Sequence, residues 1–278
     1  MPELPEVETI KNDLCPYLVG HTITDITITW PKAVIKPSSD ELERRLIGQT
    51  IKGIERRGKY LIFPLSNGEY LIMHMKMSGS LIFQPANLSQ EQVRFSRTIF
   101  TLNNEDHLHF IDPRKFGMLW LVGDKESVVG KLGPEPLSPE FTPDMLGKLL
   151  SNHHAPVKAL LCDQELIAGI GNMYADESLF AGKIHPQESG ADLSDTDVVQ
   201  LHHGIISALR AGIAHYGAST SDYYRPDGSR GMAHMSFNVA HRGGEPCLVC
   251  GTTIQRTTVR NRGTYFCPNC QRKRYPAK

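Results

Sequence analysis

Four of the six cysteines in this chain have a spacing that suits metal binding. Two residues separate the members of each of two pairs, and sixteen residues lie between the pairs. Each pair places two thiolates on one tight turn, and two such turns form a tetrahedral site for structural zinc. The sequence predicts one structural Zn²⁺ held by Cys247, Cys250, Cys267 and Cys270. For Cys15 and Cys162 we expect ordinary burial in a core.

The zinc segment is strongly basic, although the formal net charge of the whole chain is zero. From Arg242 to Lys278 there are eight Lys and Arg residues and one acid, Glu245. Four zinc-bound thiolates leave two negative charges, which are exceeded by the cations Arg256, Arg260, Arg262, Arg272, Lys273 and Arg274. A β-hairpin fits between the cysteine pairs and presents Arg262 near its tip. This charge distribution indicates a module that contacts phosphates.

The first half of the chain has the patterns of one helix and several strands, which would position any functional groups there. Apolar residues recur with helical spacing over 4–19, which predicts an amphipathic helix. The period then changes to two, and turn signals such as Ser66-Asn67-Gly68 separate the segments. We expect strands at 22–30, 50–65, 69–83, 97–102 and 107–122. Consecutive strands without intervening helices favour an antiparallel sandwich or barrel.

A proline-rich stretch at 133–139 marks a domain boundary, and helical patterns follow it. Helices are expected at roughly 139–151, 155–163, 171–183 and 194–216. Residues 217–236 are rich in Gly, Ser, Asp and Arg, so we expect a mobile loop that could act as a lid. A zinc module over 242–274 ends the chain.

The composition excludes several classes of protein. With 278 residues, 40% hydrophobic and 22% charged, the chain is typical of a globular protein with two domains and a small appendage. The start has no basic segment followed by an apolar one, so no signal peptide is expected. No stretch approaches the roughly 20 apolar residues that span a bilayer. We therefore expect a cytoplasmic protein, in which clustered cysteines bind metal and do not form disulfides.

Several ordered motifs resemble those of one known family, formamidopyrimidine-DNA glycosylase. The first is Pro2-Glu3-Leu4-Pro5-Glu6-Val7-Glu8 at the N-terminus. The others are Arg56-Arg57-Gly58-Lys59-Tyr60-Leu61, His74-Met75-Lys76-Met77-Ser78-Gly79, Asp112-Pro113-Arg114-Lys115-Phe116-Gly117, Ala168-Gly169-Ile170-Gly171-Asn172-Met173-Tyr174-Ala175-Asp176-Glu177 and Arg262-Gly263-Thr264-Tyr265-Phe266-Cys267. The sister group, endonuclease VIII, has a similar finger but usually Gly after the first Pro-Glu pair. Leu4 favours the purine-lesion branch.

The resemblance implies a multidomain α+β fold. Residues 1–132 would form an N-terminal β-sandwich with an N-terminal helix, and 133–241 a helix–two-turns–helix domain that includes the loop 217–236. Residues 242–278 would form the zinc finger. The implied activity is base-excision repair of damaged double-stranded DNA by a monomeric glycosylase and AP lyase, located in the cytoplasm with the nucleoid. No small-molecule cofactor is expected in catalysis.

The implied nucleophile is the nitrogen of Pro2 once Met1 has been removed. An α-amine has a pKa of about 7.7–8.0, so an appreciable fraction is neutral near neutral pH. Attack on C1′ of the sugar would displace the base and leave an iminium. That iminium cannot lose a proton from nitrogen, because the nitrogen of proline is secondary, and it therefore favours β- and δ-elimination. By resemblance, Glu3 protonates the ring oxygen of the sugar and Glu6 stabilises the site.

The same resemblance assigns residues that contact DNA. Lys59 and Arg262 would contact the phosphates flanking the lesion and assist the eliminations, and His74 would be a further phosphate contact. Asn172 opens a helix after a Gly-x-Gly turn, where its side chain and the first free N–H groups can bind phosphate. It could also be the helix N-cap.

A base must leave the stack before C1′ can be attacked. Met77, Arg114 and Phe116 match the family's wedge residues, which would fill the vacated space. The guanidinium of Arg114 would bond the orphaned base, while Met77 and Phe116 fill an apolar gap.

The chain departs from the family's pattern at a few positions. Arg94-Phe95-Ser96-Arg97 replaces a Lys-His-x-His run, so Arg97 would take over a histidine's phosphate contact. His153 replaces a lysine, and Ala240-His241-Arg242 replaces a Tyr-Gly-Arg run. Met232 and His234 replace a Phe-Gln pattern in the loop, which bears on lesion preference more than on reaction type.

Three hypotheses follow. The first is a glycosylase and lyase for oxidised purines, including 8-oxoguanine and formamidopyrimidines. The second is an endonuclease VIII-like enzyme for oxidised pyrimidines. The third is a catalytically silent zinc protein that binds DNA, against which Pro2, Glu3, Lys59 and Arg262 argue.

Overall fold

The computed structural model describes residues 1–83, 94–221 and 223–273. The chain divides into two compact units, and each is described by itself. The N-terminal unit contains Met1–Lys131 and His215–Met232, and the C-terminal unit contains Leu132–Ala214 and Ala233–Lys278. Arg274, one of the cations of the predicted zinc module, lies outside the described residues. Among the described residues, no helix has the length and apolar character needed to cross a membrane.

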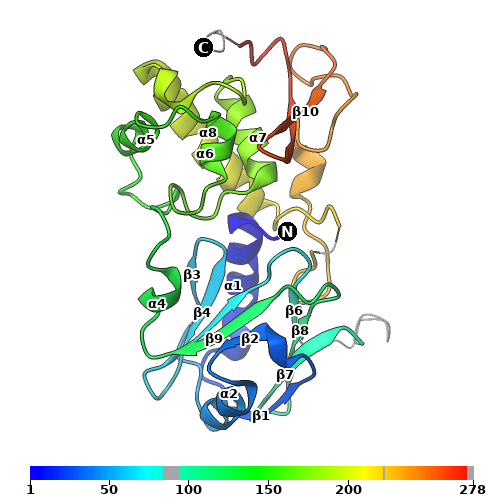
Figure 1. Ribbon diagram of the computed structural model, residues 1–278. Coiled ribbons are helices and arrows are strands. Elements are labelled where there is room, and N and C mark those ends of the chain that lie inside the picture. Colours follow the sequence, from blue (N-terminus) through cyan, green and yellow to red (C-terminus); the bar gives the residue numbers. More distant parts are fainter. Residues whose placement is uncertain (84–93, 222, 274–278) are drawn as a thin grey trace. The chain divides into compact units, whose positions relative to one another are not determined.

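The N-terminal unit contains two sheets (Figure 1). One is four-stranded and antiparallel, with the strand order β1 (Ile23–Ile28), β7 (Ser96–Leu102), β8 (His107–Ile111) and β6 (Ser80–Phe83). The other is five-stranded, with the order β2 (Val34–Lys36), β9 (Met118–Val122), β5 (Tyr70–His74), β4 (Tyr60–Pro64) and β3 (Glu55–Arg57). Among the described residues of this unit, the helical segments are α1 (Leu4–Leu18), η1 (Pro31–Ala33), α2 (Ser39–Leu46) and α4 (Glu126–Val129).

One hydrophobic core joins the two sheets, as the predicted sandwich requires. Phe100 and Phe110 enter it from the four-stranded sheet, and Phe63 and Leu71 enter it from the five-stranded sheet. The strand β7 alternates between buried and half-buried positions, because successive side chains of a strand point to opposite faces. The apolar stripe of α1 is fully buried in the same core, and the helix contacts β3 and β4.

The expected strands are present, but three of them are interrupted by turns. The segment 50–65 contains β3 and β4, 69–83 contains β5 and β6, and 107–122 contains β8 and β9. Left-handed backbone at Gly58, Lys76 and Lys115 makes these turns, and alternating hydrophobicity does not reveal it. No pattern in the sequence indicated β2, which pairs with β9 in parallel, so the sandwich is not wholly antiparallel.

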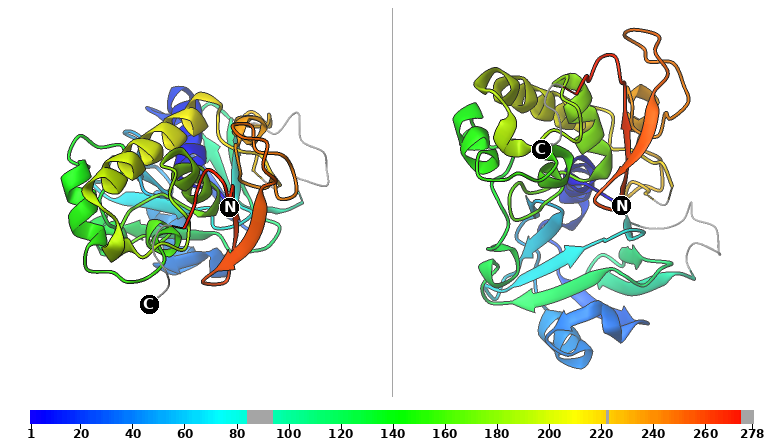
Figure 2. Two further views of the ribbon diagram at one scale, coloured as in Figure 1. Left: turned by 90° about the horizontal axis from the view of Figure 1, so that it is seen from above. Right: turned by 45° about the horizontal axis from the view of Figure 1, so that its top comes forward.

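The C-terminal unit contains helices and one hairpin (Figures 1 and 2). Its helices are α5 (Pro143–Leu150), α6 (Val157–Leu161), α7 (Asn172–Ala181) and α8 (Asp195–Ala214), with short 3-10 turns η2 (Gly190–Asp192) and η3 (Ala233–Ser236). The helices α7 and α8 pack closely at Gly204, where a Cβ atom would lie 2.5 Å from the carbonyl oxygen of Ser178. The antiparallel strands β10 (Gln255–Val259) and β11 (Arg262–Phe266) form the predicted hairpin.

The predicted mobile loop was 217–236, and most of it, within the segment His215–Met232, belongs to the N-terminal unit. Arg225 forms two hydrogen bonds with the carboxylate of Asp13 at 2.9 and 3.1 Å. Tyr223 is buried in the sandwich core. The backbone N–H of Ala218 donates to Glu6, 212 residues away in the chain. This loop is therefore hydrogen-bonded to α1 at Glu6 and Asp13.

Candidate active site and metal centre

The predicted N-terminal site begins at a capping box. Glu3 is the N-cap of α1, and its N–H donates to Oε2 of Glu6 at 2.7 Å, while the side chain of Glu3 accepts from the backbone of Glu6. Both carboxylates are buried, with exposed fractions of 2% for Glu3 and 0% for Glu6. The other oxygen of Glu6 accepts the N–H of Ala218 at 2.7 Å. Pro2 directly precedes this box and is also buried, so all three predicted residues lie together.

Lys59 follows the left-handed turn at Gly58 and is 5% exposed. The turn is tied to α1, because Arg56 donates from Nε to Glu8 at 2.7 Å and from its terminal nitrogen to the carbonyl of Gly58 at 3.1 Å. Burial alone would raise the pKa of Glu8, but bonds from Lys11 and Arg56 hold it below its ordinary value. The Arg-Arg-Gly-Lys motif thus attaches the lysine to the helix that carries Glu3 and Glu6.

His74 is a neutral imidazole with a defined tautomer. Burial, together with the charges of Lys76 and Lys59, lowers its pKa to about 3. Its Nδ1 accepts the N–H of Lys76 at 2.9 Å, so the ring proton of the neutral form belongs to Nε2. The ring of Tyr60 meets it edge to face. His74 can therefore donate one hydrogen bond to a phosphate without bringing a positive charge.

Two exposed loops carry the predicted wedge residues. Met77 is 45% exposed and Phe116 46%, so neither is a core residue. The guanidinium of Arg114 lies 5.0 Å from the centre of the Phe116 ring. Large apolar side chains at loop tips are available to fill a gap in a partner.

Asp112 joins these loops, a role that the sequence did not predict. Its Oδ1 accepts the hydroxyl of Ser78 at 2.6 Å and the N–H of Arg114 at 3.2 Å, and its Oδ2 accepts the N–H of Gly117 at 2.7 Å. Its carbonyl accepts Nε of Arg97 at 2.7 Å. The buried carboxylate of Asp112 therefore fixes both loops, and its backbone carbonyl holds Arg97, the predicted phosphate contact.

In the C-terminal unit, Asn172 is the first residue of α7, and the N-cap is Gly171. The alternative that Asn172 caps the helix is thus wrong: its side chain makes no cap bond and donates instead to the carbonyl of Gly263 at 2.9 Å. Its Oδ1 is buried and accepts no hydrogen bond from any residue that the structure describes. Asn172 therefore lies beside Arg262, the residue before Gly263.

Arg262 itself is exposed at the start of β11, and left-handed residues Arg260 and Asn261 make the two-residue turn before it. Lys158, which is fully buried, anchors this tip. Its Nζ donates to the carbonyl of Gly263 and to Oγ1 of Thr264, both at 2.8 Å, and lies 2.7 Å from Oδ1 of Asp176. The sequence alone did not predict this role for Lys158.

Asp176 and Glu177, two adjacent residues of α7, hold the strand β11 and the segment 238–240 that precedes the zinc finger. Asp176 accepts the N–H of Tyr265 at 3.1 Å, and burial raises its pKa to about 7 despite the charge of Lys158. Glu177 accepts the N–H groups of Asn238, Val239 and Ala240 at 2.8–2.9 Å. The sequence carried a signal for these contacts: two acidic residues stand in an otherwise largely apolar helix, and buried charges require partners.

The four predicted cysteines converge at the base of the hairpin. Their sulfur atoms all lie within 4.8 Å of one another, and the contacts Cys250–Cys267 and Cys250–Cys270 measure 3.5 Å. Tetrahedral Zn²⁺ with Zn–S bonds of about 2.3 Å requires sulfur atoms about 3.8 Å apart. The separations exceed a disulfide bond and match this geometry, so the cluster fits one structural zinc ion.

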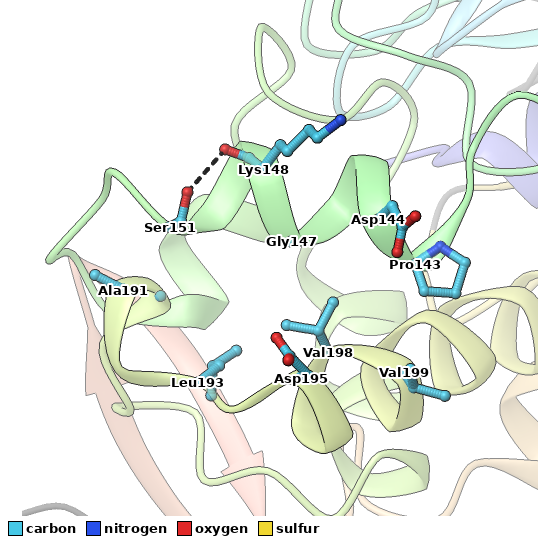
Figure 3. A pocket seen from close by; sticks show the side chains of 11 residues that line it. Pro143, Asp144, Gly147, Lys148, Ser151, Ala191, Leu193, Asp195, Val198 and Val199 are labelled. Atoms are coloured by element: carbon cyan, nitrogen blue, oxygen red, sulfur yellow. Dashed lines mark hydrogen bonds between the residues drawn. The ribbon is translucent and has the colours of Figure 1, made fainter.

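A separate groove of about 470 Å³ lies in the C-terminal unit (Figure 3). It runs between α5 and the start of α8 and is lined by side chains that include Asp144, Lys148, Leu193 and Val198. None of the predicted site residues lines it. This groove is therefore not the predicted site.

The geometry defines a class of protein with a β-sandwich, a helical domain and a four-cysteine zinc finger. Family models match these parts in order: the formamidopyrimidine-DNA glycosylase N-terminal domain at 1–119, its H2TH domain at 132–224, and a zinc finger found in FPG and IleRS at 244–272. The chain belongs to the formamidopyrimidine-DNA glycosylase family.

Relatives match over nearly the full length. The formamidopyrimidine-DNA glycosylase of Chloroflexus aurantiacus is 43% identical over 276 residues, covering 98% of each chain. That of Geobacillus kaustophilus is 40% identical over 277 residues, covering 98% of this chain and 100% of the relative.

Solved structures give the same result. Lactococcus lactis Fpg in complex with DNA containing an abasic site has a TM-score of 0.89 at 35% identity, covering 98% of this chain and 100% of the other. MutM (Fpg) of Thermus thermophilus has a TM-score of 0.87 at 35% identity, covering 97% of this chain and 98% of the other. The predicted family, fold class and zinc site are thereby confirmed.

Proposed function

We propose that this protein excises oxidised purines from duplex DNA and cleaves the resulting abasic site, with Pro2 as the nucleophile. The observation that carries the proposal is the buried group of Pro2, Glu3 and Glu6 at the start of α1, in a chain of this family. A relative from Lactococcus lactis has been solved with Fapy-dG-containing DNA, which supports a formamidopyrimidine substrate.

The chemistry follows from the positions of these groups. Removal of Met1 frees the secondary amine of Pro2, which attacks C1′ as the glycosidic bond breaks and the base leaves. Glu3 protonates the ring oxygen, the sugar opens, and the C1′–N bond becomes an iminium. Loss of a proton from C2′ then expels the 3′ phosphate, and a second elimination expels the 5′ phosphate.

Glu6 stabilises this site through two hydrogen bonds that its carboxylate accepts. Its carboxylate holds both the N–H of Glu3 and the N–H of Ala218, so it joins the catalytic terminus to the loop 215–232. Lys59, His74, Asn172 and Arg262 would bind the phosphates flanking the lesion, and Arg97 would add another contact. Zinc supplies structure at the hairpin that carries Arg262 and takes no part in these steps.

The wedge residues provide the space for base extrusion. Met77 and Phe116 would fill the gap left by the extruded nucleotide, and Arg114 would bond the orphaned base. Their exposure at loop tips supports this role. We expect the protein to act as a monomer in the cytoplasm, associated with the nucleoid through DNA.

A nicking assay tests the function directly. We expect cleavage of an 8-oxoguanine·cytosine duplex, with product sizes that show loss of both phosphates. A thymine glycol duplex of the same sequence is the comparison, because an endonuclease VIII-like enzyme would prefer it. Preference for thymine glycol would contradict the assignment to oxidised purines. If neither duplex is cleaved, the proposal that the protein is a DNA glycosylase is wrong.

A further inference from the structure

The loop His215–Met232 is bound to one face of α1 at two points. At the first, the N–H of Ala218 donates to Glu6. At the second, the guanidinium of Arg225 forms two hydrogen bonds with the carboxylate of Asp13. Glu6 and Asp13 are seven residues apart, which is about two helical turns, so they share one face of the helix about 10 Å apart. The loop is therefore held both beside the predicted catalytic residues and two turns away from them.

The contact at Asp13 contains a second interaction. The guanidinium of Arg225 lies 4.3 Å from the ring centre of Tyr216. The side chains of the ion pair are partly shielded, with exposed fractions of 20% for Arg225 and 22% for Asp13. A guanidinium that bonds both oxygens of a carboxylate and also stacks on a ring is held in one orientation. We call these three residues, Asp13, Tyr216 and Arg225, the latch.

The backbone of Tyr216 gives independent support for the latch. Its φ is +59°, in the left-handed region that favours glycine, and such a conformation persists in other residues only when the surrounding structure determines it. The next residue, Gly217, is also left-handed, and a Cβ atom there would lie 2.8 Å from Cγ of Glu6. Glycine thus stands where the loop meets Glu6, whereas a tyrosine stands one position earlier, where its ring meets Arg225.

The two arms of the loop are bonded to each other near Glu6. The N–H of Met232 donates to the carbonyl of His215 at 2.8 Å, and the N–H of Gly231 donates to Oγ of Ser219 at 2.9 Å. These bonds close a stem, and Arg225 lies beyond the stem. A loop attached at its stem alone can pivot there, so the latch limits how far its described residues can move away from α1.

We propose that Asp13 and Arg225 are positioning residues that keep the loop ordered at Glu6 before DNA binds. This inference rests on the proposed function, because Glu6 belongs to the proposed catalytic terminus. A nucleotide that leaves the stack to reach Pro2 enters the space beside Glu6. The apparent affinity of a site falls with the fraction of molecules that are in the competent form, so a loop that is already ordered there strengthens binding of the extruded nucleotide.

The test uses Arg225→Met in the full-length zinc-containing protein, which removes the charge and keeps an unbranched side chain. The matched control is Lys125→Met in the same unit. Lys125 forms an ion pair with Glu55 at 2.6 Å and lies 5.5 Å from the ring centre of Tyr70. It therefore has the same two kinds of interaction as Arg225, but it has no place in the proposed site.

Hydrogen exchange in the DNA-free protein is the first readout. Protection of the N–H groups of Ala218 and Gly231 should fall about fivefold in Arg225→Met, because a partly shielded ion pair shifts an opening equilibrium by about this factor, and it should stay unchanged in Lys125→Met. Asp13→Asn should act in the same direction. The double variant should lose no more protection than Arg225→Met, because both changes remove one interaction. Equal protection in the unaltered protein and Arg225→Met would overturn the latch.

Single-turnover excision of 8-oxoguanine, with the enzyme concentration varied, is the second readout. Arg225→Met should raise the half-saturating enzyme concentration about fivefold and leave the maximal rate unchanged, since the latch changes the fraction of ordered protein and not the chemistry. A lower maximal rate at an unchanged half-saturating concentration would overturn the positioning role. If the unaltered protein does not cleave the duplex, the proposed function is wrong, whereas the exchange measurement still decides whether the latch orders the loop.

Discussion

The N-terminal sandwich and the C-terminal hairpin hold their site residues by different means. In the sandwich, α1 buries Leu4, Val7 and Ile10 completely, and Glu3 and Glu6 at its start are buried as well. The hairpin has a small core that includes Val239 and Ile254, supplemented by four sulfur atoms and a buried lysine. Apolar packing positions Pro2, the proposed nucleophile, whereas metal and polar bonds position Arg262.

This difference has a physical consequence. Apolar packing is distributed over many contacts, so the loss of one exposed residue changes it little. A metal site or a buried charge concentrates stability in a few atoms, and its loss acts locally and strongly. The following predictions are arranged by the size of the expected effect on folding.

Loss of zinc should have the largest effect. Cys250→Ser or strong chelation should unfold the hairpin and abolish DNA binding, while the sandwich stays folded, because structural zinc supplies folding free energy locally. Metal content is measured together with binding and near-ultraviolet circular dichroism. Full nicking activity by protein shown to be free of metal would refute the role of zinc.

Loss of Lys158 should come next. Lys158→Met leaves Asp176 buried without its cation, and breaking such a pair costs about 3–5 kcal/mol. The free energy of unfolding of the C-terminal unit should fall by this amount. Lys148→Met, at an exposed position of α5, is the control and should change little. If both variants are equally stable, Lys158 does not anchor the hairpin.

His74 should affect the pH dependence of stability. Its folded pKa of about 3 lies below the unfolded value of about 6.5, so the folded state binds fewer protons and its stability is lost as pH falls below 6.5. Between pH 7 and pH 5 this contribution is about 2 kcal/mol. The variant His74→Gln should lose correspondingly less stability over this interval. Parallel stability curves would show that His74 titrates normally.

The wedge should affect folding least. Met77→Ala and Phe116→Ala remove exposed side chains, so unfolding free energies should change by less than about 0.5 kcal/mol. Excision of paired 8-oxoguanine should nevertheless slow by on the order of tenfold or more, while cleavage at a preformed abasic site changes little, because no base has to be extruded there. Equal losses on both substrates would mean that the two side chains support the fold.

Much of this organisation could be predicted from the sequence. The helix predicted at 4–19 is observed at Leu4–Leu18, because apolar spacing along one face decides its burial. The cysteine spacing likewise determined the metal cluster. Periodicity could not divide 107–122 into β8 and β9, since the interruption is a left-handed turn at Lys115 and not a change in hydrophobicity.

The polar contacts within the site could not be predicted. The bond between Glu6 and Ala218 joins residues 212 positions apart, and Lys158 meets Gly263 across 105. Such pairs depend on how distant elements pack, which no local pattern encodes. For the same reason Asn172 was expected as a possible cap, but Gly171 has that position and frees the amide for Gly263.

The central claim, that the nitrogen of Pro2 is the nucleophile, is tested most directly by trapping. Borohydride added during the reaction should reduce the iminium and join the protein covalently to DNA. Mass spectrometry should locate the adduct on an N-terminal Pro2 from which Met1 has been removed, and protein that retains Met1 should not be trapped. An adduct on Lys59 or another internal lysine, or full cleavage by protein that retains Met1, would contradict the account.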